Sequence, residues 1–168
     1  AYDEGTGYGI GVVFSKFTDD TPESIIEVIV PDVGEYVPGE FYKRELKVLL
    51  AIHEEYVRIH KKKPLCIFID AYVDLGDKKG CGQYFADAIE DTSVVIGVAK
   101  NAYVPADKVC EKVLRGSSVK PLFVTSTIVP KEDAAFLVRT LHGEHRFPTL
   151  IKKADMLTKE FVKRIKEE

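Results

Sequence analysis

Two carboxylates in this 168-residue sequence, Asp70 and Glu45, stand where a protein could use them for chemistry. Asp70 directly follows the apolar run 65–69, so it lies at the carboxyl end of a predicted buried strand. In open α/β sheets, that edge is where ligand sites form. Glu45 lies near the front of a predicted helix, immediately before its apolar stripe. Two carboxylates converging from different elements would supply the oxygen ligands that a hard cation such as Mg²⁺ requires.

Each carboxylate also has a plainer interpretation. An Asp after a strand often starts a turn, and a Glu early in a helix is usually solvated. We interpret Asp74 and Asp77, in the loop after Asp70, as turn formers. The combination of Asp70 with Glu45 is what favours a metal site.

Other patterns give weaker support to chemistry. The glycine-rich stretch 5–11 precedes a strand with no helix after it, which excludes a dinucleotide fingerprint, and we expect a flexible approach to a hairpin. The lysines at 61–63 fit a solvated helix end. His142 and His145 alone are a poor argument for a metal or a general base, and a Gly-x-Ser-x-Gly elbow is missing, so a nucleophile-type hydrolase has no support.

The apolar patterns predict the elements that position these residues. Residues 11–14 and 24–30 read as a hairpin, and the stripe that begins after Pro38 and ends before residues 61–64 predicts one long helix carrying Glu45. Short apolar runs at 65–69 and 94–98, joined by a helix at 83–89, indicate parallel strands covered on both faces. A further strand at 122–125 and helices at 131–141 and 151–166 complete the order. We expect a single soluble domain over residues 1–168.

Composition narrows the class of protein. The formal net charge of −3 gives no electrostatic footprint for nucleic acid, so any nucleic-acid contact must be local. Three cysteines without metal-type spacing indicate neither a zinc site nor a disulfide framework, and a cytoplasmic location fits best. No apolar run approaches the ~18 residues of a spanning helix, so we expect no membrane contact. A monomer is expected.

Several stretches resemble the endonuclease V family. Residues 36–45 match its Tyr-Ile/Val-Pro-Gly turn, which leads into a helix with Phe-x-x-Arg-Glu. Residues 69–70 resemble the family's strand ending in Asp, and residues 95–100 resemble its Thr-Ile-Gly-Val-Ala-Lys. Residues 120–124 and 146–155 resemble its later strand and its Arg-Leu-Pro…Ala-Asp ending. The matches come in the family's order and cover nearly the whole chain.

The resemblance implies an α/β, ribonuclease H-like fold, a mixed sheet with helices on both faces. It also implies a Mg²⁺-dependent endonuclease, with Mn²⁺ able to substitute, that cleaves DNA or RNA near deaminated purines, chiefly inosine. Glu45 and Asp70 would then occupy two of three acidic metal-site positions, Lys100 would be the active-site lysine, and Asp155 would lie near the metal. The turn thought to wedge beside the lesion corresponds to Tyr36, Val37, Pro38 and Gly39.

Two departures from the family pattern bear on specificity and on the metal site. The family's Gly-His-Gly after the metal Asp is here Ala71, Tyr72 and Val73, so we expect Ala71 and Tyr72 to contact substrate, and Tyr72 and Val73 to reshape the base pocket. If Tyr2 is the aromatic residue of the family's Asp-Val-x-Tyr, the first acidic ligand either falls before Ala1 or is replaced by Asp3, the one candidate that the sequence offers.

Two alternatives stay open. The protein could bind nucleic acid with reduced catalysis, or it could be a structure-specific nuclease without inosine preference.

Overall fold

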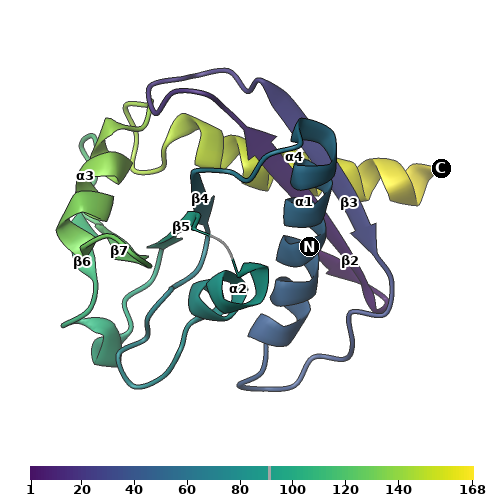
Figure 1. Cartoon of the computed structure of the whole chain (residues 1–168), viewed down its shortest axis with the longest axis horizontal. Helices are drawn as coiled ribbons and strands as arrows, with labels where there is room; N and C mark the ends of the chain where they lie inside the picture. Colours follow the sequence, from purple (N-terminus) through teal and green to yellow (C-terminus); the bar gives the residue numbers. More distant parts are fainter. Residues whose placement is uncertain (91) are drawn as a thin grey trace.

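The computed structural model describes residues 1–90 and 92–168, which form a mixed α/β fold (Figure 1). Its strands are β1 (Tyr2–Asp3), β2 (Thr6–Val13), β3 (Ser24–Val30), β4 (Cys66–Ile69), β5 (Val94–Ala99), β6 (Glu111–Val113) and β7 (Leu122–Ser126). Its α-helices are α1 (Tyr42–His60), α2 (Cys81–Ile89), α3 (Lys131–Thr140) and α4 (Thr149–Glu167), and a 3₁₀ turn, η1, spans Val104–Ala106. Every predicted helix and strand is present, whereas β1, η1 and β6 were not predicted because each is only two or three residues long.

The strands form two sheets. β1, β2 and β3 make an antiparallel sheet, and β4, β5, β7 and β6 follow one another in a mixed sheet in which β4 and β5 are parallel. The mixed sheet with covering helices is therefore confirmed. The predicted hairpin is β2 with β3, and it belongs to the first sheet. Among the described residues, β1 pairs with β2, and β4 pairs with β5 in the other sheet.

Helices cover both faces of each sheet. α1 and α4 both pack on β2, where Tyr8 meets the Phe161 ring of α4 edge-on at 6.0 Å. On the second sheet, α2 closes a core around Ile69, Phe85 and Val95, and α3 closes a larger core on the other face, around the buried Val124 and Val138. The sheet that contains β4 and β5 therefore lies between two packed layers.

The glycines of β2 correct one expectation. They lie inside the strand rather than in a flexible approach to it, and they face α1. A Cβ on Gly7 would lie 2.6 Å from Val48 Cγ2, and a Cβ on Gly11 would lie 2.6 Å from Ile52 Cγ2. Bare backbone therefore lets α1, the helix that carries Glu45, lie directly on the strand.

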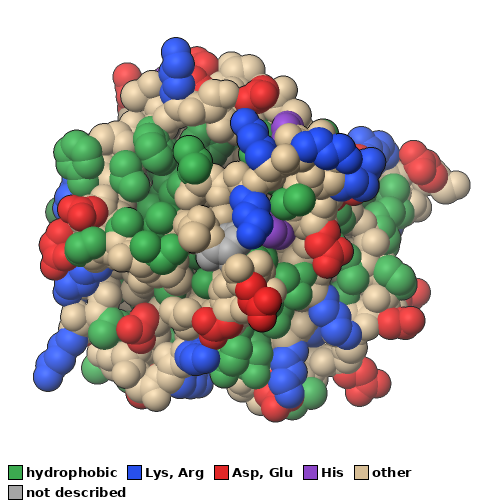
Figure 2. Space-filling view, in the orientation of Figure 1, with side chains coloured by type: hydrophobic (Ala, Val, Ile, Leu, Met, Phe, Trp, Pro, Cys, Tyr) green, Lys and Arg blue, Asp and Glu red, His purple; other side chains and the backbone are tan. Residues whose placement is uncertain are grey.

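The surface agrees with the small net charge. Figure 2 shows basic and acidic side chains interspersed over the face that carries α1 and α2. Among the helices that the structure describes, none combines the length and apolar character needed to cross a membrane.

Candidate functional site

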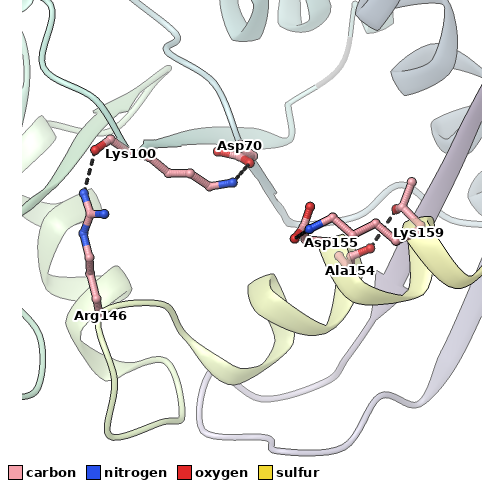
Figure 3. A network of polar contacts seen from close by, with 7 residues as sticks. Asp70, Lys100, Arg146, Ala154, Asp155 and Lys159 are labelled. Atoms are coloured by element: carbon pink, nitrogen blue, oxygen red, sulfur yellow. Dashed lines mark hydrogen bonds and ion pairs between the residues drawn. The ribbon is translucent and has the colours of Figure 1, made fainter. Parts of the chain in front are cut away.

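Asp70 and Lys100 meet at one edge of the second sheet. Each directly follows a strand, β4 and β5, and these strands are parallel with Ile69 opposite Gly97, so both side chains leave the sheet at the same end. Lys100 Nζ lies 2.7 Å from Asp70 Oδ2 (Figure 3). The predicted strand-edge position of Asp70 is confirmed, and a cation already faces its carboxylate.

Glu45 approaches this edge from the first turn of α1. Burial raises the pKa of the Glu45 carboxyl, a hydrogen bond from the Cys81 thiol at the start of α2 lowers it in part, and the negative charge of Asp70 raises it further. Glu45 and Asp70 are thus close enough for their charges to interact. The packing of α1 against α2 holds Glu45 in place.

Asp155 supplies a third carboxylate, from α4. It pairs with Lys159 at 2.8 Å, and this ion pair is the main cause that lowers the pKa of Asp155, with a smaller contribution from the charge of Lys100. The Ala1 amino group lies within electrostatic range of both Glu45 and Asp155, although burial is the main cause of its lowered pKa. Lys100 at the end of β5, Glu45 on α1 and Asp155 on α4 thus lie near Asp70, at the end of β4.

A pocket of about 240 Å³ opens at Asp70. Its other lining residues are Lys100, Phe147, Ile151, Lys152 and Asp155. We call it the Asp70 pocket. Phe147, Ile151 and Lys152 were not singled out from the sequence, because nothing in a local pattern brings α4 and the segment before it to the ends of β4 and β5. The only signal was the Arg-Phe-Pro stretch that resembles the family.

The chemistry of the donors suits a hard cation held by few protein ligands. Glu45 and Asp70 offer carboxylate oxygens, and Mg²⁺ is commonly bound through one or two carboxylates together with water and substrate phosphates. Among the described residues, no three His, Cys, Asp or Glu side chains converge closely enough to hold a metal by themselves. The residues present therefore fit a partial carboxylate site that a substrate phosphate would complete.

The predicted wedge segment is an exposed turn before α1. Tyr36 is 59% exposed and Val37 48% exposed, and Gly39 has φ +81°, a conformation that a side chain would disfavour. Tyr36 lines a separate open pocket of about 380 Å³ together with Arg44, the residue next to Glu45. Tyr36 therefore has the exposure that a segment wedging beside a base requires. The structure places it at this neighbouring pocket rather than among the residues that line the Asp70 pocket.

The loop after Asp70 corrects the expected base pocket. Val73 is 1% exposed, packs in the core with Ile69 and Phe85, and donates its backbone N–H to Thr125 Oγ1 at 2.8 Å. The expectation that Val73 projects toward substrate is therefore wrong, since the third position of this loop is tied to β7. Tyr72 packs beside Phe123, and its hydroxyl donates to the Asn101 carbonyl at 2.7 Å.

Ala71 packs at the margin of the same core as Val73, and its carbonyl approaches Gly97 of β5 closely enough that no Cβ would fit there. Substrate contacts by Ala71 and Tyr72 stay predictions. Asp3 is not brought to the Asp70 pocket. Its carboxylate pairs with Lys166 Nζ of α4 at 3.0 Å.

Comparison with known proteins identifies solved structures that share this fold. The sequence matches no protein-family model, and no curated protein matches it significantly. Solved structures do match. Endonuclease V of Ciona intestinalis, in complex with a 23mer DNA that contains an inosine followed by a ribo-adenosine, superposes with a TM-score of 0.73 at 16% identity, covering 96% of this chain and 86% of that one.

Two further structures agree. The catalytic domain of human endonuclease V gives a TM-score of 0.66 at 16% identity, covering 95% of this chain and 82% of that one. The Bacillus subtilis endonuclease V gives 0.67 at 16% identity, covering 88% and 70%. The expected ribonuclease H-like α/β class is confirmed by these matches. The protein therefore has the fold of endonuclease V.

Proposed function

We propose that this protein is a Mg²⁺-dependent endonuclease that cleaves DNA or RNA near deaminated purines, with inosine as the first substrate to test. The observation that carries the proposal is the convergence of Glu45, Asp70 and Lys100 at one sheet edge of an endonuclease V fold. The Ciona structure with this fold is bound to DNA containing inosine, which supports the choice of substrate.

The roles of the residues follow from their chemistry. Asp70 and Glu45 would hold the Mg²⁺ ion, which supplies Lewis-acid stabilisation of phosphate charge and activation of water, and Mn²⁺ would serve as well. Lys100, 39% exposed beside Asp70, can turn its ammonium from the carboxylate to a substrate phosphate and stabilise the charge that develops there. Tyr36, exposed on its turn, can stack against a base.

One observation favours a second function. In the described structure, Lys100 occupies one oxygen of Asp70, and no three acidic, His or Cys side chains converge to hold a metal. A protein of this fold that binds nucleic acid through the Asp70 pocket, with reduced catalysis, would have the same features.

A substrate panel tests the proposal. Strands containing inosine, uracil, a mismatch or a flap, in DNA and in RNA, are incubated with Mg²⁺ and the products are separated by length. We expect cleavage of the inosine strand above its undamaged control. Binding of the strand by the protein without any cleavage product would favour the binding protein. Cleavage of flap substrates that lack inosine, at the same rate as the inosine strand, would favour a structure-specific nuclease.

Conservative variants then test the assigned residues. Asp70→Asn and Glu45→Gln should each lower the single-turnover cleavage rate by at least about a hundredfold, because each removes a ligand charge. Glu54→Gln is the matched control, since Glu54 is an exposed carboxylate on α1. Cleavage that survives both site variants would remove Asp70 and Glu45 from the chemistry.

A further inference from the structure

A network of hydrogen bonds centred on Arg146 adjoins the Asp70 pocket. Arg146 donates from Nη2 to the Lys100 carbonyl at 2.6 Å and to the Pro121 carbonyl at 2.8 Å. Lys100 follows β5 and Pro121 precedes β7, and these antiparallel strands are adjacent, with Ala99 opposite Phe123. One guanidinium nitrogen therefore joins the ends of two strands. Figure 3 shows its contact with the carbonyl of Lys100, the residue whose side chain reaches Asp70.

The loop that carries Arg146 is itself fixed from inside. Arg115 is 6% exposed, and its guanidinium donates to the carbonyls of Leu141 at 2.5 Å, His145 at 2.8 Å and Gly143 at 3.1 Å. Burial lowers the pKa of Arg115, but a guanidinium stays charged at any ordinary pH. Charged donors to several carbonyls of one loop hold that loop, and Arg146 with it, in a single conformation.

Phe147 links the two cations across the pocket wall. Its ring centroid lies 5.2 Å from the Arg146 guanidinium carbon and 5.5 Å from Lys100 Nζ, both within the range of a cation–π contact. Because Phe147 also lines the Asp70 pocket, the ring limits the directions in which the Lys100 ammonium can point.

We propose that Arg146 is a positioning residue for Lys100: it fixes the Lys100 backbone through the carbonyl, and with Phe147 it directs the ammonium toward Asp70 in the Asp70 pocket. A lysine side chain has a flexible four-carbon stem, so its effect at a phosphate depends on how well its base is held. The catalytic consequence rests on the proposed function, whereas the positioning itself does not.

The first experiment measures the reactivity of the Lys100 amine in the absence of substrate. The folded protein is treated with trace acetic anhydride, and the acetylation rate of Lys100 relative to the exposed Lys62 is measured by peptide mass spectrometry. We expect Arg146→Ala to change this ratio severalfold, and millimolar guanidinium chloride, which can occupy the space left by the side chain, to move it back toward the wild-type value. Arg139→Ala, on an exposed position of α3, is the control and should leave the ratio unchanged.

The second experiment reads the reaction. Arg146→Ala should lower kcat about tenfold or more, with a smaller change in KM, because a misplaced group costs the transition state more than substrate binding. Guanidinium should restore part of the rate to Arg146→Ala and none to Lys100→Ala. Arg146→Lys, which keeps the charge but not the paired geometry, should recover only part of the activity. Melting curves of each variant show that the fold is retained.

The two experiments separate the two proposals. Wild-type protein that cleaves no strand of the panel, with a Lys100 acetylation ratio that still depends on Arg146 and guanidinium, would overturn the proposed function and keep the positioning role. An unchanged ratio in folded Arg146→Ala would overturn the positioning role, whatever the cleavage activity. A loss of rate in Arg146→Ala that guanidinium does not restore would overturn the catalytic consequence of that positioning.

Discussion

At the scale of single residues, the ion pair between Lys100 and Asp70 can be exchanged. The side chains are 39% and 48% exposed, and ion pairs of that exposure contribute only ~0–1 kcal/mol to stability. Breaking the pair to let Asp70 meet a cation and Lys100 meet a phosphate therefore costs little. A site that must admit a charged polymer benefits from such a replaceable contact.

Cys66, at the start of β4, gives a prediction on thiol chemistry. Burial raises the pKa of the Cys66 thiol to about 11, so the reactive thiolate is scarce at neutral pH. At pH 8 we expect iodoacetamide to label Cys66 roughly a hundredfold more slowly in the folded than in the urea-unfolded protein. Peptide mass spectrometry measures the label at this residue alone. Equal rates in both states would show that Cys66 is open to solvent.

The same pKa shift makes a statement about stability. Because the folded-state pKa is raised, the folded form prefers the neutral thiol. The contribution of the neutral Cys66 thiol to the free energy of unfolding is fully present below the unfolded pKa of about 8.5. It is lost as pH rises toward the folded-state pKa of about 11. The difference in free energy of unfolding between wild type and Cys66→Ala should therefore shrink over that interval. A difference that stays constant would contradict the shift.

At the scale of elements, the fit of α1 onto β2 decides where Glu45 lies. Gly7 and Gly11 present bare backbone to the helix, where Val48 and Ile52 fill the space that a Cβ would need. The rest of α1 carries the apolar stripe that closes the core with α2. A small change in the spacing between α1 and β2 would move the Glu45 carboxylate relative to Asp70.

Gly7→Ala tests this contact. The added Cβ would lie 2.6 Å from Val48 Cγ2 and 2.8 Å from Val33 Cγ1, so we expect the free energy of unfolding to fall by ~1–3 kcal/mol, as overpacking usually costs. Urea denaturation measures it. In the double variant Gly7→Ala/Val48→Ala the loss should be smaller than the sum of the two single losses. Strict additivity would mean that this contact does not set the spacing.

At the scale of the whole molecule, the net charge is −3, and basic and acidic side chains are interspersed over the face that Figure 2 shows. Two lysines, Lys100 and Lys152, line the Asp70 pocket, where under the proposed function they would attract a nucleic-acid phosphate. Long-range steering is then weak, and recognition depends on short-range contacts.

The salt dependence of nucleic-acid binding tests whether phosphate contacts lie at the Asp70 pocket. With about two phosphate contacts, the slope of log K against log salt for a single strand should be about −1 to −2, and Lys152→Gln should make it shallower by about 0.7. Fluorescence anisotropy with a labelled inosine strand in EDTA, from low to high KCl, gives the slope. Lys62→Gln, at the basic end of α1, is the control. An equal change of slope in Lys62→Gln would show that the phosphate contacts are not specific to the Asp70 pocket.

The sequence by itself determined the longer helices and strands and the places of two carboxylates relative to them. The β-branched, apolar run at 24–30 and the stripe through α1 are local patterns, and β3 and α1 follow them closely. The apolar run before Asp70 predicted a strand, and the strand ends immediately before that residue. Such features depend on neighbours in the chain, which periodicity records.

Only the tertiary structure decided which side chains share the pocket and which are buried. Val73 follows the candidate metal-site Asp70 by three residues, yet it is fixed in the core by Thr125, 52 residues later in the chain. Phe147 reaches Lys100 from the segment before α4, and the β2 glycines matter because a helix lies on them. These contacts join distant parts of the chain, and a contact of that kind leaves no period or spacing in the sequence for a local pattern to record.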